Sequence, residues 1–168
     1  MSSLTGKPEL TSAAPIENDG FWPDLALGDL MAQYRIPAEY DSAVISNALK
    51  LAMFNTNTYL QPVKDALVLL EYTTLLSAAT AYTVETPALI HYNNAVFSRA
   101  KAMLLQQFNT MNRRPNAENA VKTAPETEDY LMKEAAYSVK RLFDLFAVAD
   151  VVEDESASYG DGVLVSLI

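Results

Sequence analysis

Apolar side chains recur at helical spacing in three long segments of this chain, and this periodicity limits the folds that it can adopt. Within residues 38–61, 87–110 and 127–147 the apolar positions follow one another mostly at steps of three and four, so they share one face of a helix. A helix with one apolar face must bury that face against another element, as the helices of a bundle do. The pattern therefore predicts an all-α fold, an antiparallel helical bundle formed by residues 21–147.

Residues that suit helix starts stand near the ends of these segments. Thr86 and Pro87 predict the start of the middle helix, because a hydroxyl suits the cap position and proline suits the first helical position. Thr127 marks the expected start of the last long helix, and Asp29 is expected to cap or open a short early one. Pro62 interrupts the first long segment, because a helix can begin at proline but cannot run through it without a kink.

Two segments between the long helices are less regular. In "VKDALVLLEYTTLLSAATAYTVET" the first half has a helical pattern, whereas residues 72–84 are rich in Thr and Tyr with weak periodicity. Helical and non-helical structures are equally compatible with that second half. Residues 112–126 form a polar connection with two prolines, and connections of this length are usually functional or disordered.

The two ends of the sequence differ from its middle. Residues 1–20 are rich in Ser, Thr, Pro and Gly and predict a flexible arm. Residues 148–168 join an acidic tether to a final apolar segment with the alternation of a short β-strand. Such a strand either folds back on its own chain or pairs with a partner protein, and the residues alone leave both open. The predicted partner-binding residues are Val163, Leu164, Val165, Ser166, Leu167 and Ile168, together with Phe21 and Trp22 at the start of the bundle.

Charge and composition exclude several classes of function. The net charge is −9, whereas nucleic-acid binders carry a basic patch, and no run of basic residues here is longer than a pair such as Arg113–Arg114. Sequence-specific DNA binding is therefore not expected. The first 20 residues lack the apolar core of a secretory signal, and no uncharged stretch exceeds 13 residues, too few to span a bilayer. We expect a protein of the cytosol or of a particle assembled there.

Residues that carry catalysis or hold metals are scarce. The chain has no cysteine, a single histidine, His91, and no Gly-rich phosphate loop among its five glycines. The acidic residues around Asp150 lack the spacing of a calcium-binding EF-hand loop. We therefore predict a non-enzymatic protein without cofactor or metal, and a hydrolase that uses His91 is the weakest alternative.

Several segments, in their order along the chain, resemble the head completion family (head–tail connectors, gpL) of temperate contractile-tailed bacteriophages. The stretch "GFWPDLALGDLMAQYRI" is similar to the start of that family's ordered region, and "VISNALKLAMFNTNTYL" resembles its next helix. "EYTTLLSAAT", "TPALIHYNNAVFSRAKAMLLQQF" and "DYLMKEAAYSVKRLF" are similar to later blocks, and "GVLVSLI" to a β-like ending. The resemblance covers roughly residues 21–168 and depends on the succession of segments rather than on one motif.

This resemblance implies a structural virion protein. Such proteins have a helical bundle of the adaptor type and dock on the portal as a ring of about 12 copies once the genome is packaged. They stabilise the filled head and present the tail-attachment surface. The implied partners are the portal, neighbouring copies and a tail-completion or neck protein. DNA would pass through the ring without sequence-specific binding, and no membrane is involved.

The resemblance also bears on location and on local structure. It implies the virion neck as the final location, with host cytoplasm during assembly. It implies that residues 72–85 form a loop or extended excursion rather than a helix. The terminal strand would then pair with the portal or with a neighbouring subunit. The alternative from a different class is a small acidic helical regulator or inhibitor that binds a host or phage protein through the same strand.

Overall fold

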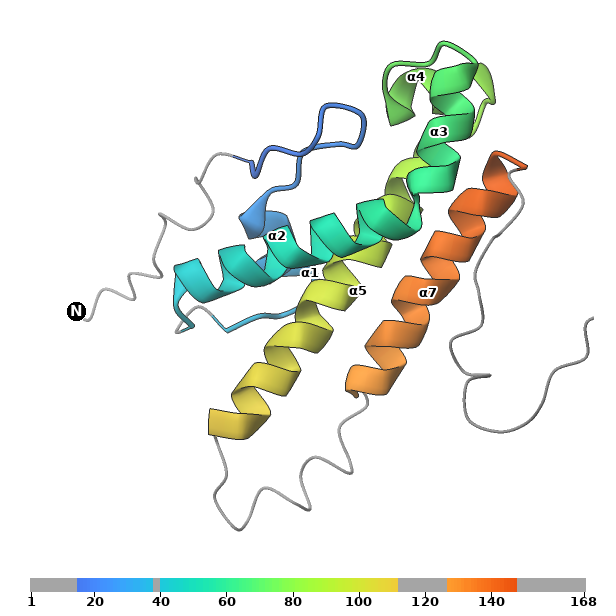
Figure 1. The fold of residues 1–168 in the computed structure, drawn as a ribbon. Helices are drawn as coiled ribbons and strands as arrows, with labels where there is room; N and C mark the ends of the chain where they lie inside the picture. Colours follow the sequence, from blue (N-terminus) through green and yellow to red (C-terminus); the bar gives the residue numbers. More distant parts are fainter. Residues whose placement is uncertain (1–14, 38–39, 112–126, 148–168) are drawn as a thin grey trace, which may run out of the picture.

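Six helices form the part of the chain that the computed structural model describes, residues 15–37, 40–111 and 127–147 (Figure 1). The all-α prediction is confirmed for these residues, in which the only β-type pairing is an isolated bridge between Ile16 and Leu25. The helices are α1 (Leu27–Gln33), α2 (Ser42–Tyr59), α3 (Gln61–Leu69), α4 (Leu75–Ala81), α5 (Glu85–Met111) and α7 (Glu128–Leu145).

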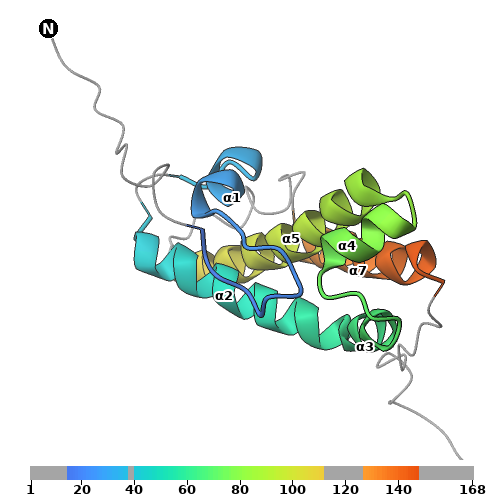
Figure 2. The same cartoon turned by 90° about the horizontal axis from the view of Figure 1, so that it is seen from above.

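Helix α5 organises the fold, because it packs against α2, α4 and α7. Helix α7 lies antiparallel alongside α5, and α2 crosses α5 on another side (Figures 1 and 2). Helix α1 and the segment before it cover a further side of α5, as the view from above shows (Figure 2). The core lies where these elements meet, and its largest fully buried side chains include Tyr92 and Phe97 of α5 and Phe143 of α7.

Two of the predicted helix starts agree with the structure, and a third is close to it. Thr127 caps α7, since its hydroxyl accepts a hydrogen bond from the Tyr130 backbone N–H at 3.2 Å. Pro62 stands in the first turn of α3, so the chain starts a new helix there instead of kinking the old one. Helix α5 begins at Glu85, so Pro87 lies in its first turn but Thr86 is inside the helix rather than at its cap position. Asp29, by contrast, does not cap α1, because the cap position is Ala26 and Asp29 is the third residue of the helix, in its first turn.

The expectation of a loop or extended excursion over residues 72–85 is wrong, because this segment contains helix α4. Thr74 and Ser77 form a capping box: the Thr74 hydroxyl accepts from the Ser77 backbone N–H, and the Ser77 hydroxyl accepts from that of Thr74. Two alanines and a leucine then bury one face of this short helix completely, which compensates for its low intrinsic stability. These residues are Leu75, Ala78 and Ala79.

Part of the predicted N-terminal arm is fixed in the structure. Ile16 exchanges two backbone hydrogen bonds with Leu25, so residues 15–20 form a loop that returns to the bundle. Residues 1–14, the connection 112–126 and the segment 148–168 lie outside the described residues. The terminal strand, and its pairing with a partner, therefore stay predictions.

Four of the helices end on a residue with positive φ that is not glycine. Arg35, Glu71, Thr83 and Ala147 follow α1, α3, α4 and α7, with φ between 50° and 66°. A left-handed residue at this position lets its backbone N–H bond to a carbonyl of the preceding turn. The Ala147 N–H, for example, donates to the Asp144 carbonyl at 3.3 Å. These turns stop the helices sharply, and the last one sets the direction in which the chain leaves α7.

Candidate interaction surfaces

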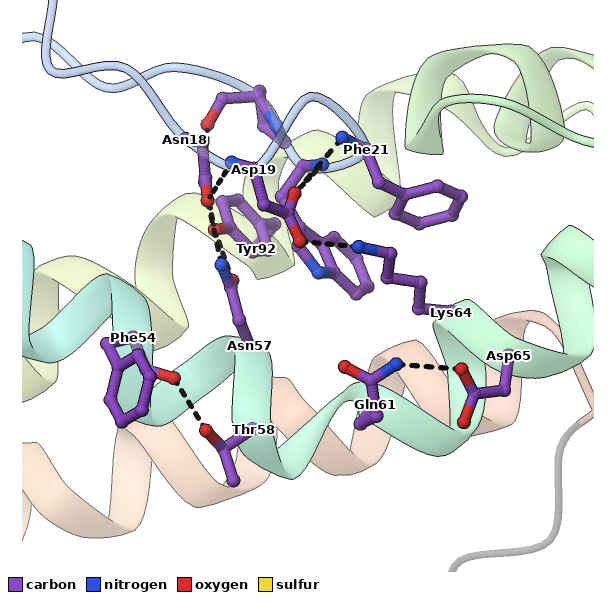
Figure 3. A network of polar contacts seen from close by, with 12 residues as sticks. Asn18, Asp19, Phe21, Phe54, Asn57, Thr58, Gln61, Lys64, Asp65 and Tyr92 are labelled. Atoms are coloured by element: carbon purple, nitrogen blue, oxygen red, sulfur yellow. Dashed lines mark hydrogen bonds and ion pairs between the residues drawn. The ribbon is translucent and has the colours of Figure 1, made fainter.

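Three side chains close a ring of hydrogen bonds that holds the N-terminal loop on the helices (Figure 3). The Asn18 amide donates to the Tyr92 hydroxyl at 2.7 Å, and that hydroxyl donates to Asn57 Oδ1 at 2.8 Å. The Asn57 amide donates back to Asn18 Oδ1 at 2.7 Å. Burial raises the pKa of the Tyr92 hydroxyl, so it stays protonated and can donate. The ring joins the loop, α2 and α5.

Asp19 makes a second attachment beside this ring. One of its oxygens accepts from the backbone N–H groups of Phe21 and Trp22 at 3.0 and 3.1 Å, and the other lies 2.6 Å from Lys64 Nζ on α3 (Figure 3). Burial opposes ionisation of this carboxyl, but the hydrogen bonds from Lys64, Trp22 and Phe21 outweigh it. The pKa of Asp19 is therefore lower than its usual value.

Phe21 and Trp22, predicted to contact a partner, lie in the chain's own core. They are 5% and 2% exposed, and the Trp22 indole stacks on the Tyr92 ring. Phe21 meets Trp22 edge-on, with 5.0 Å between the ring centroids. Side chains buried to this degree attach the N-terminal segment to α5 and are not surface residues of the described chain. The sequence signal, two aromatics before a proline, is the same for either role.

A cavity of about 440 Å³ opens between α1, α5 and α7 next to the single histidine. His91 lies edge-on to Tyr137, and burial, then the charge of Arg141, lower the pKa of His91. Within the described residues His91 makes no hydrogen bond, and the Ser138 hydroxyl accepts from Asn94 instead. No nucleophile–base pair is therefore assembled here. The lining residues are Gln33, Tyr34, Ile90, His91, Asn93, Asn94, Glu134, Tyr137 and Ser138.

Large apolar side chains are exposed from the last turns of α3 through α4. Leu69 is 84% exposed, and its neighbours are about half exposed. We call this the α3–α4 surface; its residues are Val68, Leu69, Leu70, Leu76 and Tyr82. Sequence reasoning missed it, although the run "ALVLLEYTTLL" holds more apolar residues than one face of a short helix can bury.

Arg99 is a buried cation that pairs with no carboxylate in the described part of the chain. It is 8% exposed, its Nε has no hydrogen-bond partner, and its guanidinium lies 4.9 Å from the centre of the Tyr59 ring. Tyr59 is half exposed at the end of α2, so one side of this pair faces water. No sequence signal distinguished Arg99, because its position on α5 is compatible with an outward-facing charge.

Neither a metal centre nor a membrane span occurs among residues 15–37, 40–111 and 127–147. No three potential metal ligands of the His, Asp or Glu type gather in these segments. None of the helices found there has the length and apolar character needed to cross a bilayer. The predicted partner-binding residues 163–168 lie outside the described part of the chain.

Comparison with known proteins gives two matches. A family model described as "Phage head completion protein (GPL)" matches residues 16–147. The chain is also 28% identical, over 135 residues, to the "Probable head completion/stabilization protein" of Haemophilus phage HP1 (strain HP1c1). That alignment covers 76% of this chain and 84% of the relative. No solved structure matches the chain significantly.

Proposed function

Because this chain belongs to the phage head completion protein (GPL) family, we propose that it docks as a ring on the portal of a filled head. It is a structural, non-enzymatic component of a phage particle that completes and stabilises the head. In the proposed ring, which contains about 12 copies, the protein also presents the surface to which the tail attaches. The location in the particle is then the neck, between portal and tail.

The observation that carries this proposal is the extent of the family match. It runs from Ile16 in the N-terminal loop to Ala147 after α7, so it includes all six described helices. The two attachments of the N-terminal loop lie inside that span, which supports assigning the loop to the bundle rather than to a separate arm. The exposed apolar α3–α4 surface is also suited to contacts with another protein.

A ring makes physical sense of the acidic composition. Each subunit contacts the next through two different surfaces, and the rotation between copies closes the circle. With a net charge of −9 per copy, a ring of about 12 copies carries on the order of a hundred excess negative charges around the path of the DNA. Charge of this sign repels the phosphate backbone, so the duplex can pass without sequence-specific binding.

We assign the segment 163–168 to the portal or a neighbouring copy in the assembled ring, where main-chain hydrogen bonds of an added strand would supply affinity. The test removes residues 163–168 and measures attachment to purified portal-bearing filled heads. The truncated protein is expected to keep its helicity by circular dichroism and to lose attachment. His91→Ala is the matched control and is expected to attach normally, because this side chain makes no hydrogen bond among the described residues.

Two results would contradict the proposal. If the truncated protein attaches as well as the full chain, residues 163–168 have no role in attachment. Full-length protein that forms no ring on the portal, as seen by electron microscopy of the mixture, removes the portal-docking function itself.

A further inference from the structure

The α3–α4 surface is apolar over a continuous stretch of sequence. Between Ala66 and Val84 the only charged residue is Glu71, and four leucine or valine side chains there are at least half exposed. Apolar side chains that are clustered in this way, rather than scattered singly, mark a site that something covers. No described element of the chain covers them.

The described chain ends beside this surface. Phe146, directly after α7, is buried, and its ring meets Tyr82 edge-on with 5.4 Å between the centroids. Tyr82 also meets Tyr72, in the turn between α3 and α4, at 6.2 Å. In Figure 1 the end of α7 and the helices α3 and α4 lie at the same end of the molecule. The described chain therefore ends, at Ala147, next to the turn after α4.

The distances suit the length of the tether. Residues 148–162 separate Ala147 from the apolar segment that begins at Val163. A flexible chain of this length has a root-mean-square span of about 20 Å and a fully extended reach of about 50 Å. Ring contacts of 5.4 and 6.2 Å connect Phe146 through Tyr82 to Tyr72, and Leu69 lies three residues before Tyr72. The α3–α4 surface is therefore within the extended reach of the tether.

The segment has the chemistry that this surface accepts. Residues 163–168 are five aliphatic side chains and one serine, without a charge. The carboxylates from Asp150 to Asp161 all precede this segment in the sequence, so packing of its apolar side chains requires no burial of these charges. A short tether also raises the effective concentration of the segment at its own surface to the order of millimolar, so binding within one chain exceeds binding between dilute subunits.

We propose that in the free subunit the segment 163–168 packs on the α3–α4 surface of its own chain. It leaves that surface only when the portal or a neighbouring copy offers a stronger site. The release on docking rests on the proposed function, whereas the packing in the free subunit does not. Before assembly the α3–α4 surface covers the terminal segment, and after assembly the same surface is free for new contacts.

The absence of native cysteine makes this directly testable. One variant combines Leu69→Cys with Leu167→Cys and is treated with a short, cleavable bifunctional thiol cross-linker at low protein concentration. The control combines Tyr130→Cys with Leu167→Cys. Tyr130 is 49% exposed in the first turn of α7, about 24 Å along that helix from Phe146 and within the extended reach of the tether.

Cross-linking within a monomer is expected to be about tenfold faster in the Leu69 variant than in the Tyr130 control. Products are separated by denaturing electrophoresis, which distinguishes a closed monomer from linked dimers. Equal rates at the two positions, or no closed monomer, would overturn the proposal. Dimers and higher products in place of closed monomers would overturn it too, in favour of a neighbouring copy as the occupant.

A second measurement separates this inference from the proposed function. The closed Leu69 variant is mixed with portal-bearing heads before and after the linker is cleaved. Attachment only after cleavage supports release of the segment on docking. Equal attachment of closed and cleaved forms overturns the release step, while the closed monomer still establishes the packing. Failure of the uncross-linked full-length chain to attach contradicts the proposed function alone.

Discussion

The indole of Trp22 stacks on the phenol ring of Tyr92, with 5.1 Å between the ring centroids and only 1° between their planes. The hydroxyl of the same Tyr92 belongs to the ring of hydrogen bonds with Asn18 and Asn57. One residue of α5 thus holds the N-terminal segment by its face and by its polar end. The segment before α1 is consequently part of the bundle's core.

Replacing Tyr92 with Phe keeps the stacking but removes the hydroxyl. Asn57 Oδ1 loses its donor and Asn18 loses an acceptor, so we expect a loss of about 1–3 kcal/mol in the free energy of unfolding. Denaturant unfolding followed by circular dichroism and by the fluorescence of the single tryptophan measures it. Tyr59→Phe is the control, expected within about 0.5 kcal/mol of wild type, because the half-exposed Tyr59 hydroxyl makes no hydrogen bond in the described structure. Equal losses in both variants would contradict the role of the ring.

The lowered pKa of Asp19 predicts that its contribution to stability depends on pH. Because its folded pKa is lower than its unfolded value of about 3.9, its stabilisation is complete above that value and is lost as pH falls through the folded pKa. The difference in melting temperature between wild type and Asp19→Asn should be largest above about pH 5 and shrink in acid. Thermal melts from neutral to acidic pH measure it.

The control for this experiment is Asp65→Asn. Asp65 is exposed on α3 and accepts from Gln61 one turn earlier, so its replacement should change stability by less than about 0.5 kcal/mol. A difference for Asp19→Asn that stays constant from neutral to acidic pH would show that its carboxylate contributes nothing through its charge.

Thr83 adopts a backbone conformation that suits glycine better. Its φ is 58° in the turn after α4, and a β-branched residue is strained there. Thr83→Gly should raise the free energy of unfolding by about 1 kcal/mol, since glycine reaches this conformation without steric cost. Thr83→Ala keeps a Cβ atom, so its free energy of unfolding should rise much less. Thermal unfolding of the three proteins checks this, and a less stable glycine variant would contradict it.

Helix α4 shows where sequence patterns fail. Periodicity predicted α5 and α7 because each is long, has one apolar face and has a recognisable start. Helix α4 has seven residues and depends on a capping box whose third position is Ser77, in place of the usual Glu or Gln. Its stability comes from alanines buried against the bundle, which a local pattern does not reveal.

The candidate surfaces were less predictable than the helices. The partners in the hydrogen-bond ring, Asn18, Asn57 and Tyr92, come from distant parts of the chain, and each of the two asparagines alone resembles an ordinary surface residue. Trp22, which the sequence predicted to contact a partner, is buried, and Leu69, which lies in an apolar run, is exposed. Such reversals depend on which elements pack together, and that information is absent from single segments.

Arg99 leads to a prediction opposite in sign to those for most buried residues. Burying a guanidinium without a carboxylate is unfavourable, and the contact with Tyr59 offsets about 0.5–2 kcal/mol of that cost. Met fills a similar volume without a charge, so Arg99→Met should leave the free energy of unfolding within about 1 kcal/mol of wild type or raise it.

Arg99→Ala separates the contribution of the side-chain stem from that of the charge. It removes the stem as well as the charge, and the lost packing should cost about 1–3 kcal/mol. Denaturant unfolding of the three proteins under identical conditions distinguishes the cases. If Arg99→Met and Arg99→Ala both lowered the free energy of unfolding by more than about 2 kcal/mol, the guanidinium itself would be a stabilising group. The reason is that Met retains a side-chain stem and Ala does not, so the loss common to both variants is that of the charged group. If only Ala is destabilised, the fold uses Arg99 for the packing of its stem rather than for its charge.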